Sequence, residues 1–260
     1  MDEMQYLSFQ THLIVCPLVF LAGFVDAIAG GGGLISMPAY LLAGLPAHYA
    51  MGTSKIASSF GTFTAALRFI KSGQINWKAS ILAGIGSFLG SLGGSAVALM
   101  ISDEALKLVM LLVLPAVAVF LLIKKDFGIS TEQTKPMSAV RLSALSLTIG
   151  LVIGGYDGLI GPGTGTFLVL ALTGLLGFDL LKSSGCAKVV NLMSNIASMI
   201  VFTLNKKAII ALAIPAAVFS MAGYYLGARL AVAGGSKYVR YTIFLVIGLL
   251  FIKLAADLFF

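Results

Sequence analysis

The chain has 260 residues, of which 59% are hydrophobic and 10% are charged, and its mean hydropathy is +1.03. A soluble domain typically has about 45–50% apolar and roughly 25% charged residues, so the charge here is too sparse to cover a water-facing surface. This composition excludes an ordinary soluble enzyme, a disordered chain and a nucleic-acid binder built on a basic face. The class that remains is a polytopic membrane protein, in which a net charge of +7 fits basic cytoplasmic loops.

Apolar runs of helical length follow one another along the chain. Because a spanning helix needs roughly 20 residues, this length allows about eight to ten spans. The long runs cover residues 12–29, 49–70, 79–101, 105–123, 139–153, 184–204, 208–232 and 239–259. Two shorter stretches, 34–45 and 166–176, each follow a glycine cluster and predict broken or re-entrant segments. We expect an all-α polytopic membrane protein with about eight full spans and two short segments.

The two halves of the chain match when the sequence is superposed on itself. An offset of 131 places Asp26, Gly30 and Gly32 on Asp157, Gly161 and Gly163, and an offset of 133 places Gly52, Lys55, Gly90 and Gly94 on Gly185, Lys188, Gly223 and Gly227. We predict two homologous transmembrane repeats, residues 1–126 and 135–260, joined by a central polar loop at 127–134. Internal duplication is the usual construction of secondary transporters, whose substrate site lies at the repeat interface.

The relative orientation of the repeats depends on how many times each half crosses the membrane. Basic residues flank two loops and acidic residues occupy the turn between them: Arg68, Lys71 and Lys78; Lys124, Lys125, Lys135 and Arg141; Asp103 and Glu104. The positive-inside rule places the basic loops in the cytoplasm. Repeats with five membrane elements each are inverted, whereas four spans each with re-entrant short segments make them parallel. We favour inverted repeats, which place Arg229, Lys237 and Arg240 inside and Lys206 and Lys207 outside; parallel repeats reverse both.

Glycine clusters precede both short segments. Gly30, Gly31, Gly32 and Gly33 follow Asp26, and a Gly-Pro-Gly-Thr-Gly run at 161–165 follows Asp157. Successive glycines break a helix, and irregular backbone at membrane depth is tolerated only inside protein or beside a wet cavity. The helix that restarts would aim free N–H groups at the break, which makes an anion site. Close helix packing through small residues is the alternative interpretation, and it is the one we expect for the stripes of glycine at 86–94 and 223–227.

A lysine recurs inside an apolar run of each half, in Gly52-Thr53-Ser54-Lys55 and Gly185-Cys186-Ala187-Lys188. Intramembrane charges are costly and are functional candidates, although a lysine near a helix end also snorkels to the interface. Ser58, Asn191 and Asn195 continue the same helical faces. The candidate substrate-binding residues are Gly31, Gly32, Gly33, Thr53, Ser54, Lys55, Ser58, Gly163, Thr164, Gly165, Cys186, Lys188, Asn191 and Asn195.

Asp26 and Asp157 are the acids beside the glycine breaks. They either couple transport to a proton or pair electrostatically with Lys55 and Lys188, or they satisfy amides of the breaks as structural groups. No metal site is expected, because His12 and His48 have no ligand spacing, and nothing in the sequence predicts a cofactor. An intramembrane enzyme using Ser54 or Cys186 would need a base within reach of the nucleophile, and neither histidine is spaced to supply one.

At these motifs the chain resembles the sulfite exporter TauE/SafE family. The similar stretches are residues 25–38, from Val25 to Pro38, then 50–62, 156–167 and 187–195, so the resemblance covers essentially the whole chain in both repeats. It implies a bacterial or archaeal inner-membrane permease for anionic sulfur compounds such as sulfite, sulfonates or sulfoacetate. Because the family is broad, the resemblance supports an anion transporter better than it supports sulfite.

We therefore expect a secondary transporter, not an enzyme, that moves a small sulfur-containing anion across the inner membrane by alternating access and with ion coupling. An uncoupled anion channel is the runner-up. The partners would be the anion, the lipid bilayer and a coupling proton or sodium ion, with no nucleic acid. The sequence leaves the oligomeric state open.

Overall fold

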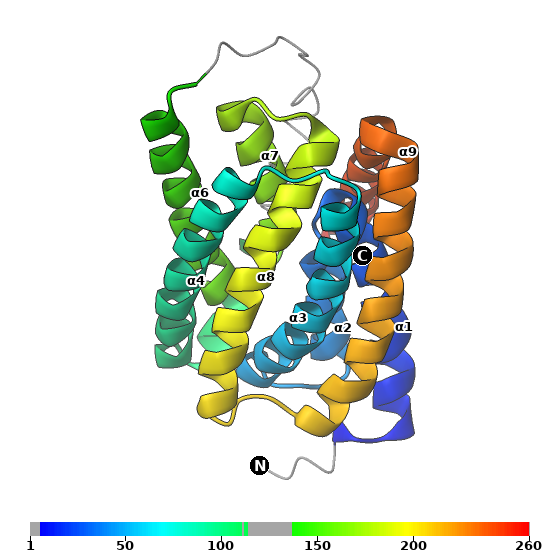
Figure 1. The fold of residues 1–260 in the computed structure, drawn as a ribbon. Helices are drawn as coiled ribbons and strands as arrows, with labels where there is room; N and C mark the ends of the chain where they lie inside the picture. The colour runs from blue at the N-terminus through cyan, green and yellow to red at the C-terminus, as the bar shows by residue number, and fades with distance from the viewer. Residues whose placement is uncertain (1–5, 111, 114–136, 260) are drawn as a thin grey trace.

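The computed structural model describes residues 6–110, 112–113 and 137–259, with side chains described up to residue 235. Within these residues the regular elements are helices, and no strand is present (Figure 1). The helices are α1 (Phe9–Ala29), α2 (Gly33–Leu42), α3 (Ala47–Lys71), α4 (Trp77–Met100), α6 (Ala139–Leu159), α7 (Thr164–Leu176), α8 (Leu180–Leu204) and α9 (Ile210–Phe259). Most of the predicted run at 105–123 and all of the predicted loop at 127–134 lie outside the described residues.

Short polar side chains fix where four of these helices begin. Ser8, Asn76, Ser138 and Asp179 precede α1, α4, α6 and α8, and each accepts a hydrogen bond from the backbone N–H three residues further on. Such a cap satisfies one of the N–H groups that the first helical turn leaves free. The cap at Asp179 explains why α8 begins at Leu180, four residues before the predicted apolar run at 184–204.

Five of the described helices are long and apolar enough to cross a membrane. They are α1, α4, α6, α8 and the Ile210–Gly235 part of α9, whereas α2 and α7 are too short. The α9 helix is interrupted at Gly235, where the backbone is non-helical with φ 67°. The α3 helix has a comparable length but carries Lys55, Arg68 and Lys71. The chain is thus an all-helical, multi-pass membrane protein, and the expectation of about eight full spans stays a prediction.

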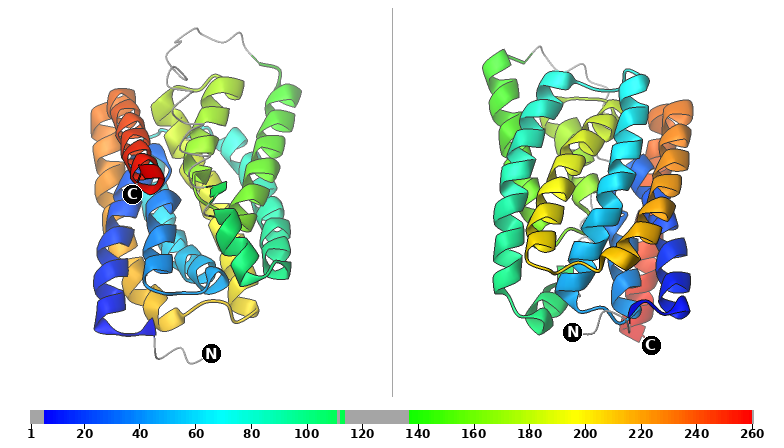
Figure 2. Two further views of the ribbon diagram at one scale, coloured as in Figure 1. Left: turned by 180° about the vertical axis from the view of Figure 1, so that it is seen from behind. Right: turned by 60° about the horizontal axis from the view of Figure 1, so that its bottom comes forward.

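The long helices run in both directions through the bundle. In Figure 1, α1, α3 and the first part of α9 run upward from the lower end, while α4, α6 and α8 run downward. After α1 ends, α2 turns back toward the lower end, where α3 begins; after α6 ends, α7 turns back toward the upper end, where α8 begins (Figures 1 and 2). The two glycine breaks are therefore approached from opposite ends of the bundle and meet inside it.

Glycine allows two helix pairs to pack with their backbones in contact. A Cβ atom on Gly90 of α4 would lie 2.1 Å from the Leu151 carbonyl oxygen of α6, and one on Gly223 of α9 would lie 2.1 Å from the Phe20 carbonyl oxygen of α1. Real side chains do not come this close, so only glycine fits, which confirms the prediction that the glycine stripes are packing surfaces. Leu151 follows Phe20 by 131 residues, so the two contacts occupy matching places in the two halves.

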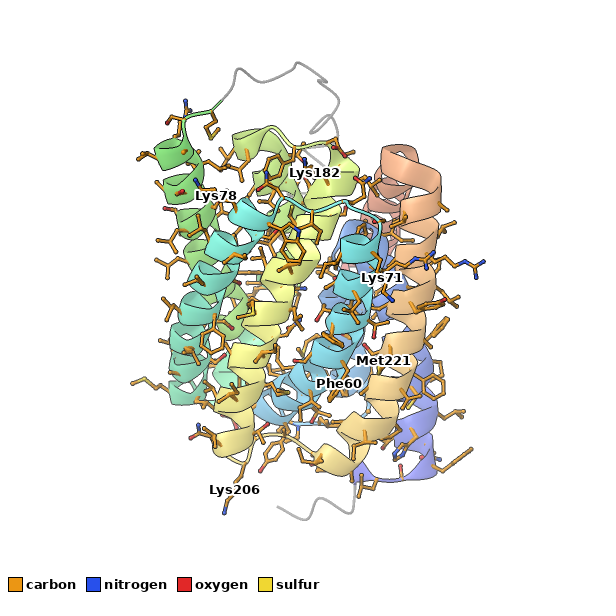
Figure 3. The ribbon with its side chains drawn as sticks, in the orientation of Figure 1. Phe60, Lys71, Lys78, Lys182, Lys206 and Met221 are labelled. Carbon is orange, nitrogen blue, oxygen red and sulfur yellow. The ribbon has the colours of Figure 1, made fainter. Side chains whose placement is uncertain are left out.

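Basic side chains lie toward both ends of the bundle. Lys78 and Lys182 lie near the upper end and Lys206 projects from the lower end (Figure 3). Near the lower end, the ammonium of Lys207 lies 5.3 Å from the centre of the Tyr49 ring. Lys237 and Arg240 have side chains outside the described residues.

Candidate functional site

The two glycine breaks lie against each other at the centre of the helix bundle. A Cβ atom on Gly30 would lie 2.2 Å from the carbonyl carbon of Gly165, and one on Gly165 would lie 2.8 Å from the Cα of Gly30. Gly30 also has φ 77° with an extended ψ of −179°, and Gly163 is left-handed with φ 87°; glycine adopts both positive-φ conformations without strain. The broken-helix interpretation is therefore confirmed at both clusters, because each separates two helices and provides a close backbone contact.

Each buried lysine pairs with the aspartate of the other half. The Nζ atom of Lys55 in α3 lies 2.5 Å from Oδ2 of Asp157 in α6. In the matching pair, Nζ of Lys188 in α8 lies 2.7 Å from Oδ2 of Asp26 in α1. The exposed fractions of these four residues are 6% or less. The lysines and the acids that match between the two halves of the sequence therefore also make matching ion pairs in the structure.

The two acids have different surroundings. The Asp26 carboxylate accepts hydrogen bonds from the Gly32 N–H at 2.9 Å and from the Tyr224 hydroxyl at 2.8 Å. Lys188 donates to this carboxylate and to the backbone carbonyl of Asp26. Among the described residues, by contrast, Lys55 is the only hydrogen-bond donor to the Asp157 carboxylate. Asp26 is thus fixed by its own break and two other helices, and Asp157 by one lysine.

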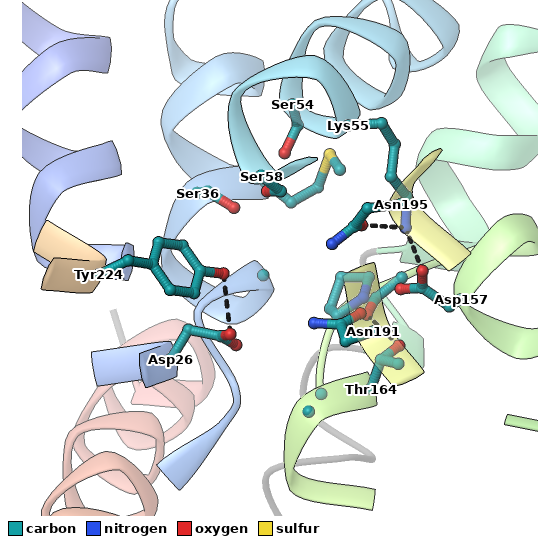
Figure 4. A pocket seen from close by; sticks show the side chains of 16 residues that line it. Asp26, Ser36, Ser54, Lys55, Ser58, Asp157, Thr164, Asn191, Asn195 and Tyr224 are labelled. Atoms are coloured by element: carbon teal, nitrogen blue, oxygen red, sulfur yellow. Dashed lines mark hydrogen bonds and ion pairs between the residues drawn. The ribbon is translucent and has the colours of Figure 1, made fainter. Parts of the chain in front are cut away.

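A small polar cavity lies between the two breaks (Figure 4). Its volume is about 40 Å³, and since one water needs roughly 10–15 Å³ of such space, it has room for a few waters or one small solute. The cavity is lined by Asp26, Gly33, Ser36, Met37, Ser54, Lys55, Ser58, Asp157, Gly161, Pro162, Gly163, Thr164, Gly165, Asn191, Asn195 and Tyr224. Both acids, Lys55 and two carboxamides therefore face one shared space.

Two helices begin at the wall of this cavity. The α2 helix starts at Gly33 and α7 starts at Thr164, and these residues line the cavity together with Gly165. Neither Gly33 nor Gly165 donates its N–H to a backbone acceptor among the described residues. A helix N-terminus carries partial positive charge and free N–H groups, and two of them around one space form a favourable environment for an anion.

The lysines differ in their access to the cavity. Lys55 lines it and also donates a hydrogen bond to Asn195 Oδ1 at 3.2 Å. Lys188 has an exposed fraction of 0% and lies outside the lining, with its ammonium 5.8 Å from the centre of the Tyr224 ring. The charges within each ion pair also cancel, since one ammonium group faces one carboxylate in each. An incoming anion thus meets no uncompensated lysine in this conformation.

Most of the residues expected from the sequence come together here. Those that line the cavity are Gly33, Ser54, Lys55, Ser58, Gly163, Thr164, Gly165, Asn191, Asn195, Asp26 and Asp157. Those that do not are Gly31, Gly32, Thr53, Cys186 and Lys188. Gly32 instead binds Asp26 through its N–H and lines an adjoining chamber.

Thr53 and Cys186 each accept a hydrogen bond from the backbone just before a helix of the other half. The hydroxyl of Thr53 accepts the Ile209 N–H, before α9, at 3.0 Å, and the thiol of Cys186 accepts the Asn76 N–H, before α4, at 3.2 Å. Cys186 follows Thr53 by 133 residues and Ile209 follows Asn76 by the same number. The hydroxyl and the thiol therefore perform the same structural task in the two halves.

Sequence reasoning missed five lining residues: Ser36, Met37, Gly161, Pro162 and Tyr224. Tyr224 lies within the stripe of small residues on α9 that was interpreted as helix packing. The one signal in the sequence was its place between Gly223 and Gly227, whose packing brings α9 onto α1 and so carries the tyrosine to Asp26.

Comparison with known proteins identifies a family of membrane transporters. The sequence profile of the sulfite exporter TauE/SafE family matches residues 15–254. A probable membrane transporter protein of Sinorhizobium sp. is 32% identical, with 98% of this chain and 96% of that protein aligned. The probable membrane transporter protein YfcA of Escherichia coli K12 is 30% identical over 96% of this chain and 94% of its own length.

A third relative, a probable membrane transporter protein of Haemophilus influenzae, is 35% identical over 85% of each chain. No solved structure matches the chain significantly. A family match over nearly the whole length, relatives named as membrane transporters and five apolar helices of spanning length lead to one conclusion. The chain belongs to the sulfite exporter TauE/SafE family of membrane transporters.

Proposed function

We propose that this protein is a secondary transporter for a small sulfur-containing anion, an inorganic oxyanion such as sulfite or an organosulfonate. The observation that carries the proposal is the cavity that two helix N-termini, Lys55 and two carboxamides line together. Backbone N–H groups, hydroxyls and an ammonium are the donors that bind sulfur oxyanions in proteins. The name of the family supports the same substrate class.

Alternating access by two inverted repeats is the proposed way of moving the anion. Three observations support it: α1 and α6 run in opposite directions (Figure 1), the Lys–Asp pairs cross between the halves, and the glycine contacts of α4 with α6 match those of α9 with α1. In such transporters one repeat rocks against the other around a site at their interface. The crossed ion pairs lie at that interface, so the motion would change their surroundings.

Charge balance favours proton coupling at Asp157. Burying a further negative charge beside two carboxylates is costly unless a positive charge is freed. A proton on Asp157 would release Lys55, which already lines the cavity, to pair with the anion. Asp26 is a poorer carrier, because its carboxylate is already held by Gly32, Tyr224 and Lys188.

The competing functions have weaker support. Catalysis by Cys186 would require a thiol with access to solute, but its exposed fraction is 0% and it accepts the Asn76 N–H. Ser54 lines the cavity, but His48 bonds the Ala98 carbonyl and lies outside the lining. An uncoupled anion channel would conduct along the electrochemical gradient alone.

The test is uptake by proteoliposomes of sulfite, sulfate, thiosulfate and a series of alkanesulfonates, each with and without an imposed pH gradient. We expect saturable uptake of at least one sulfur anion that the pH gradient drives against its concentration gradient. Flux without saturation or accumulation would establish a channel. A protein that is correctly inserted and moves none of these anions would disprove the proposal.

A further inference from the structure

A second chamber adjoins the central cavity and is lined by hydroxyl groups. Five residues line both spaces: Gly33, Ser36, Ser54, Ser58 and Tyr224. The second chamber, of about 20 Å³, adds Tyr40 of α2 and Ser220 of α9. We call it the hydroxyl chamber and define it by Ser36, Tyr40, Ser54, Ser58, Ser220 and Tyr224.

Tyr40 is the residue that marks this chamber as a binding site. Its exposed fraction is 0%, and its hydroxyl is buried without a hydrogen-bond partner. Buried polar groups are nearly always hydrogen-bonded, since an unsatisfied one loses its interaction with water and gains nothing in return. Because Tyr40 is one of the residues that line the chamber, an occupant of that space is the candidate for the missing partner.

The serines of the chamber are also available to an occupant. The side chains of Ser36, Ser54 and Ser58 point into the space beside Tyr224 (Figure 4). None of these three hydroxyls is hydrogen-bonded to another described residue. Since a hydroxyl both donates and accepts, the chamber can bind an uncharged group of either kind.

The chamber contrasts with the central cavity in its charge. Asp26, Lys55 and Asp157 line the cavity, but the lining of the hydroxyl chamber contains no ionisable residue other than its two tyrosines. A charged group would therefore bind in the cavity and an uncharged hydrogen-bonding group in the chamber. The two spaces together fit a molecule with one end of each kind.

The chamber is only partly matched in the other half of the chain. At the matching positions, Ser36 corresponds to Phe167, Tyr40 to Ala171 and Ser54 to Ala187, whereas Ser58 corresponds to Asn191, Ser220 to Ser87 and Tyr224 to Ser91. The hydroxyls of Ser36, Tyr40 and Ser54, on α2 and α3, are therefore replaced by apolar side chains in the second half.

We infer that the hydroxyl chamber is a specificity subsite for an uncharged hydroxyl group on the transported anion. This inference rests on the proposed function and narrows it: the substrate class is an organic anion with a hydroxyl group, in preference to a bare inorganic oxyanion. The anionic group binds at the breaks beside Lys55, and Tyr40 with its neighbouring serines binds the hydroxyl.

The experiment compares a matched pair of probes, ethanesulfonate and 2-hydroxyethanesulfonate, in proteoliposomes. We expect uptake of the hydroxylated anion with a KM about tenfold lower, because the pair differs by a hydroxyl for which the site provides partners. Tyr40→Phe removes only the phenolic oxygen and should reduce this preference to about twofold or less. Ser220→Ala, on a different helix, should also reduce it. Tyr225→Phe, on the exposed side of α9, is the matched control and should keep the full preference.

Equal KM values for the two sulfonates in the unchanged protein would overturn the inference and leave the chamber as a water site. So would a preference that survives both Tyr40→Phe and Ser220→Ala. These results are distinct from failure of the proposed function, which would appear as no uptake of either sulfonate or of any inorganic sulfur anion and would overturn the inference as well.

Discussion

Lys55 and Asp157 are 102 residues apart in the chain, yet their ammonium and carboxylate groups lie 2.5 Å apart at the wall of the central cavity. The pair joins α3 of the first half to α6 of the second. Because it is buried, removal of one partner leaves the other as an uncompensated charge.

The first prediction separates the two lysines. Lys55→Met should abolish anion binding, because Lys55 lines the cavity, and it should also lower the free energy of unfolding by about 3–5 kcal/mol by leaving Asp157 unpaired. Adding Asp157→Asn should restore most of the stability but not the binding. Thermal unfolding in detergent and anion binding to the purified protein measure the two effects.

Lys188→Met is the matched comparison, since Lys188 makes the equivalent pair away from the cavity lining. It should lower the free energy of unfolding by a similar amount. The double variant Lys188→Met with Asp26→Asn should recover most of this stability and should bind the anion, unlike the Lys55 double variant. If the Lys55 double variant binds the anion as well as the unchanged protein does, Lys55 is structural too.

The second prediction concerns proton coupling. Asp157→Asn preserves size but cannot take up a proton, so pH-gradient-driven accumulation should be lost. Exchange of external for internal anion, which needs no net proton movement, should persist. Proteoliposomes with an imposed pH gradient and with preloaded anion measure the two activities. Accumulation that persists in Asp157→Asn would exclude this carboxylate as the proton carrier.

The third prediction tests the contact between the two breaks. Gly30→Ala introduces a Cβ atom 2.2 Å from the Gly165 backbone at a residue with φ 77°. Gly44→Ala is the matched control, because Gly44 has φ 85° but nothing within 4 Å of a Cβ. The control should lose about 1–2 kcal/mol from backbone strain alone, and Gly30→Ala should lose clearly more, together with transport. Equal losses in thermal unfolding would show that the close approach of the breaks is unimportant.

The fourth prediction follows from the equivalent tasks of Thr53 and Cys186. Thr53→Val keeps the shape but removes the acceptor for the Ile209 N–H, so the free energy of unfolding should fall by about 1–2 kcal/mol. Cys186→Ser keeps an acceptor for the Asn76 N–H and should transport normally, whereas Cys186→Ala should resemble Thr53→Val. Loss of transport in Cys186→Ser without loss of stability would instead place the thiol in the solute pathway.

The fifth prediction concerns placement in the membrane. Lys78→Cys and Lys182→Cys lie toward the upper end of the bundle in Figure 3, and Lys206→Cys lies at the lower end. A membrane-impermeant thiol reagent should label the first two from one side of the membrane and the third from the other, with the basic upper end in the cytoplasm. The background for labelling is Cys16→Ser with Cys186→Ser, which removes the native thiols. Labelling of all three from one side would contradict the proposed inverted repeats.

The sequence by itself determined the class of protein and the position of the breaks. With 10% charged residues the chain cannot cover itself in water, and the family motifs extend over both halves. The glycines at 30–33 and 161–165 predicted interrupted helices because successive glycines break a helix, and both clusters precede a short apolar run. Matching offsets also indicated that Asp26, Lys55, Asp157 and Lys188 belong together.

Only the tertiary structure decided how these residues pair. The sequence offsets allow each lysine to bind the acid of either half, and the choice depends on which helices run side by side and in which direction. The same packing keeps Lys188 away from the cavity and brings Tyr224 to Asp26. It also places Thr53 and Cys186, which lie in α3 and α8, where they accept hydrogen bonds from the backbone before α9 and α4. Tyr40 shows the limit most clearly: its sequence context is that of an apolar helix, and its free hydroxyl exists only because α2 folds back against the central cavity. Contacts between distant residues depend on the arrangement of whole helices, which no local pattern in the sequence encodes.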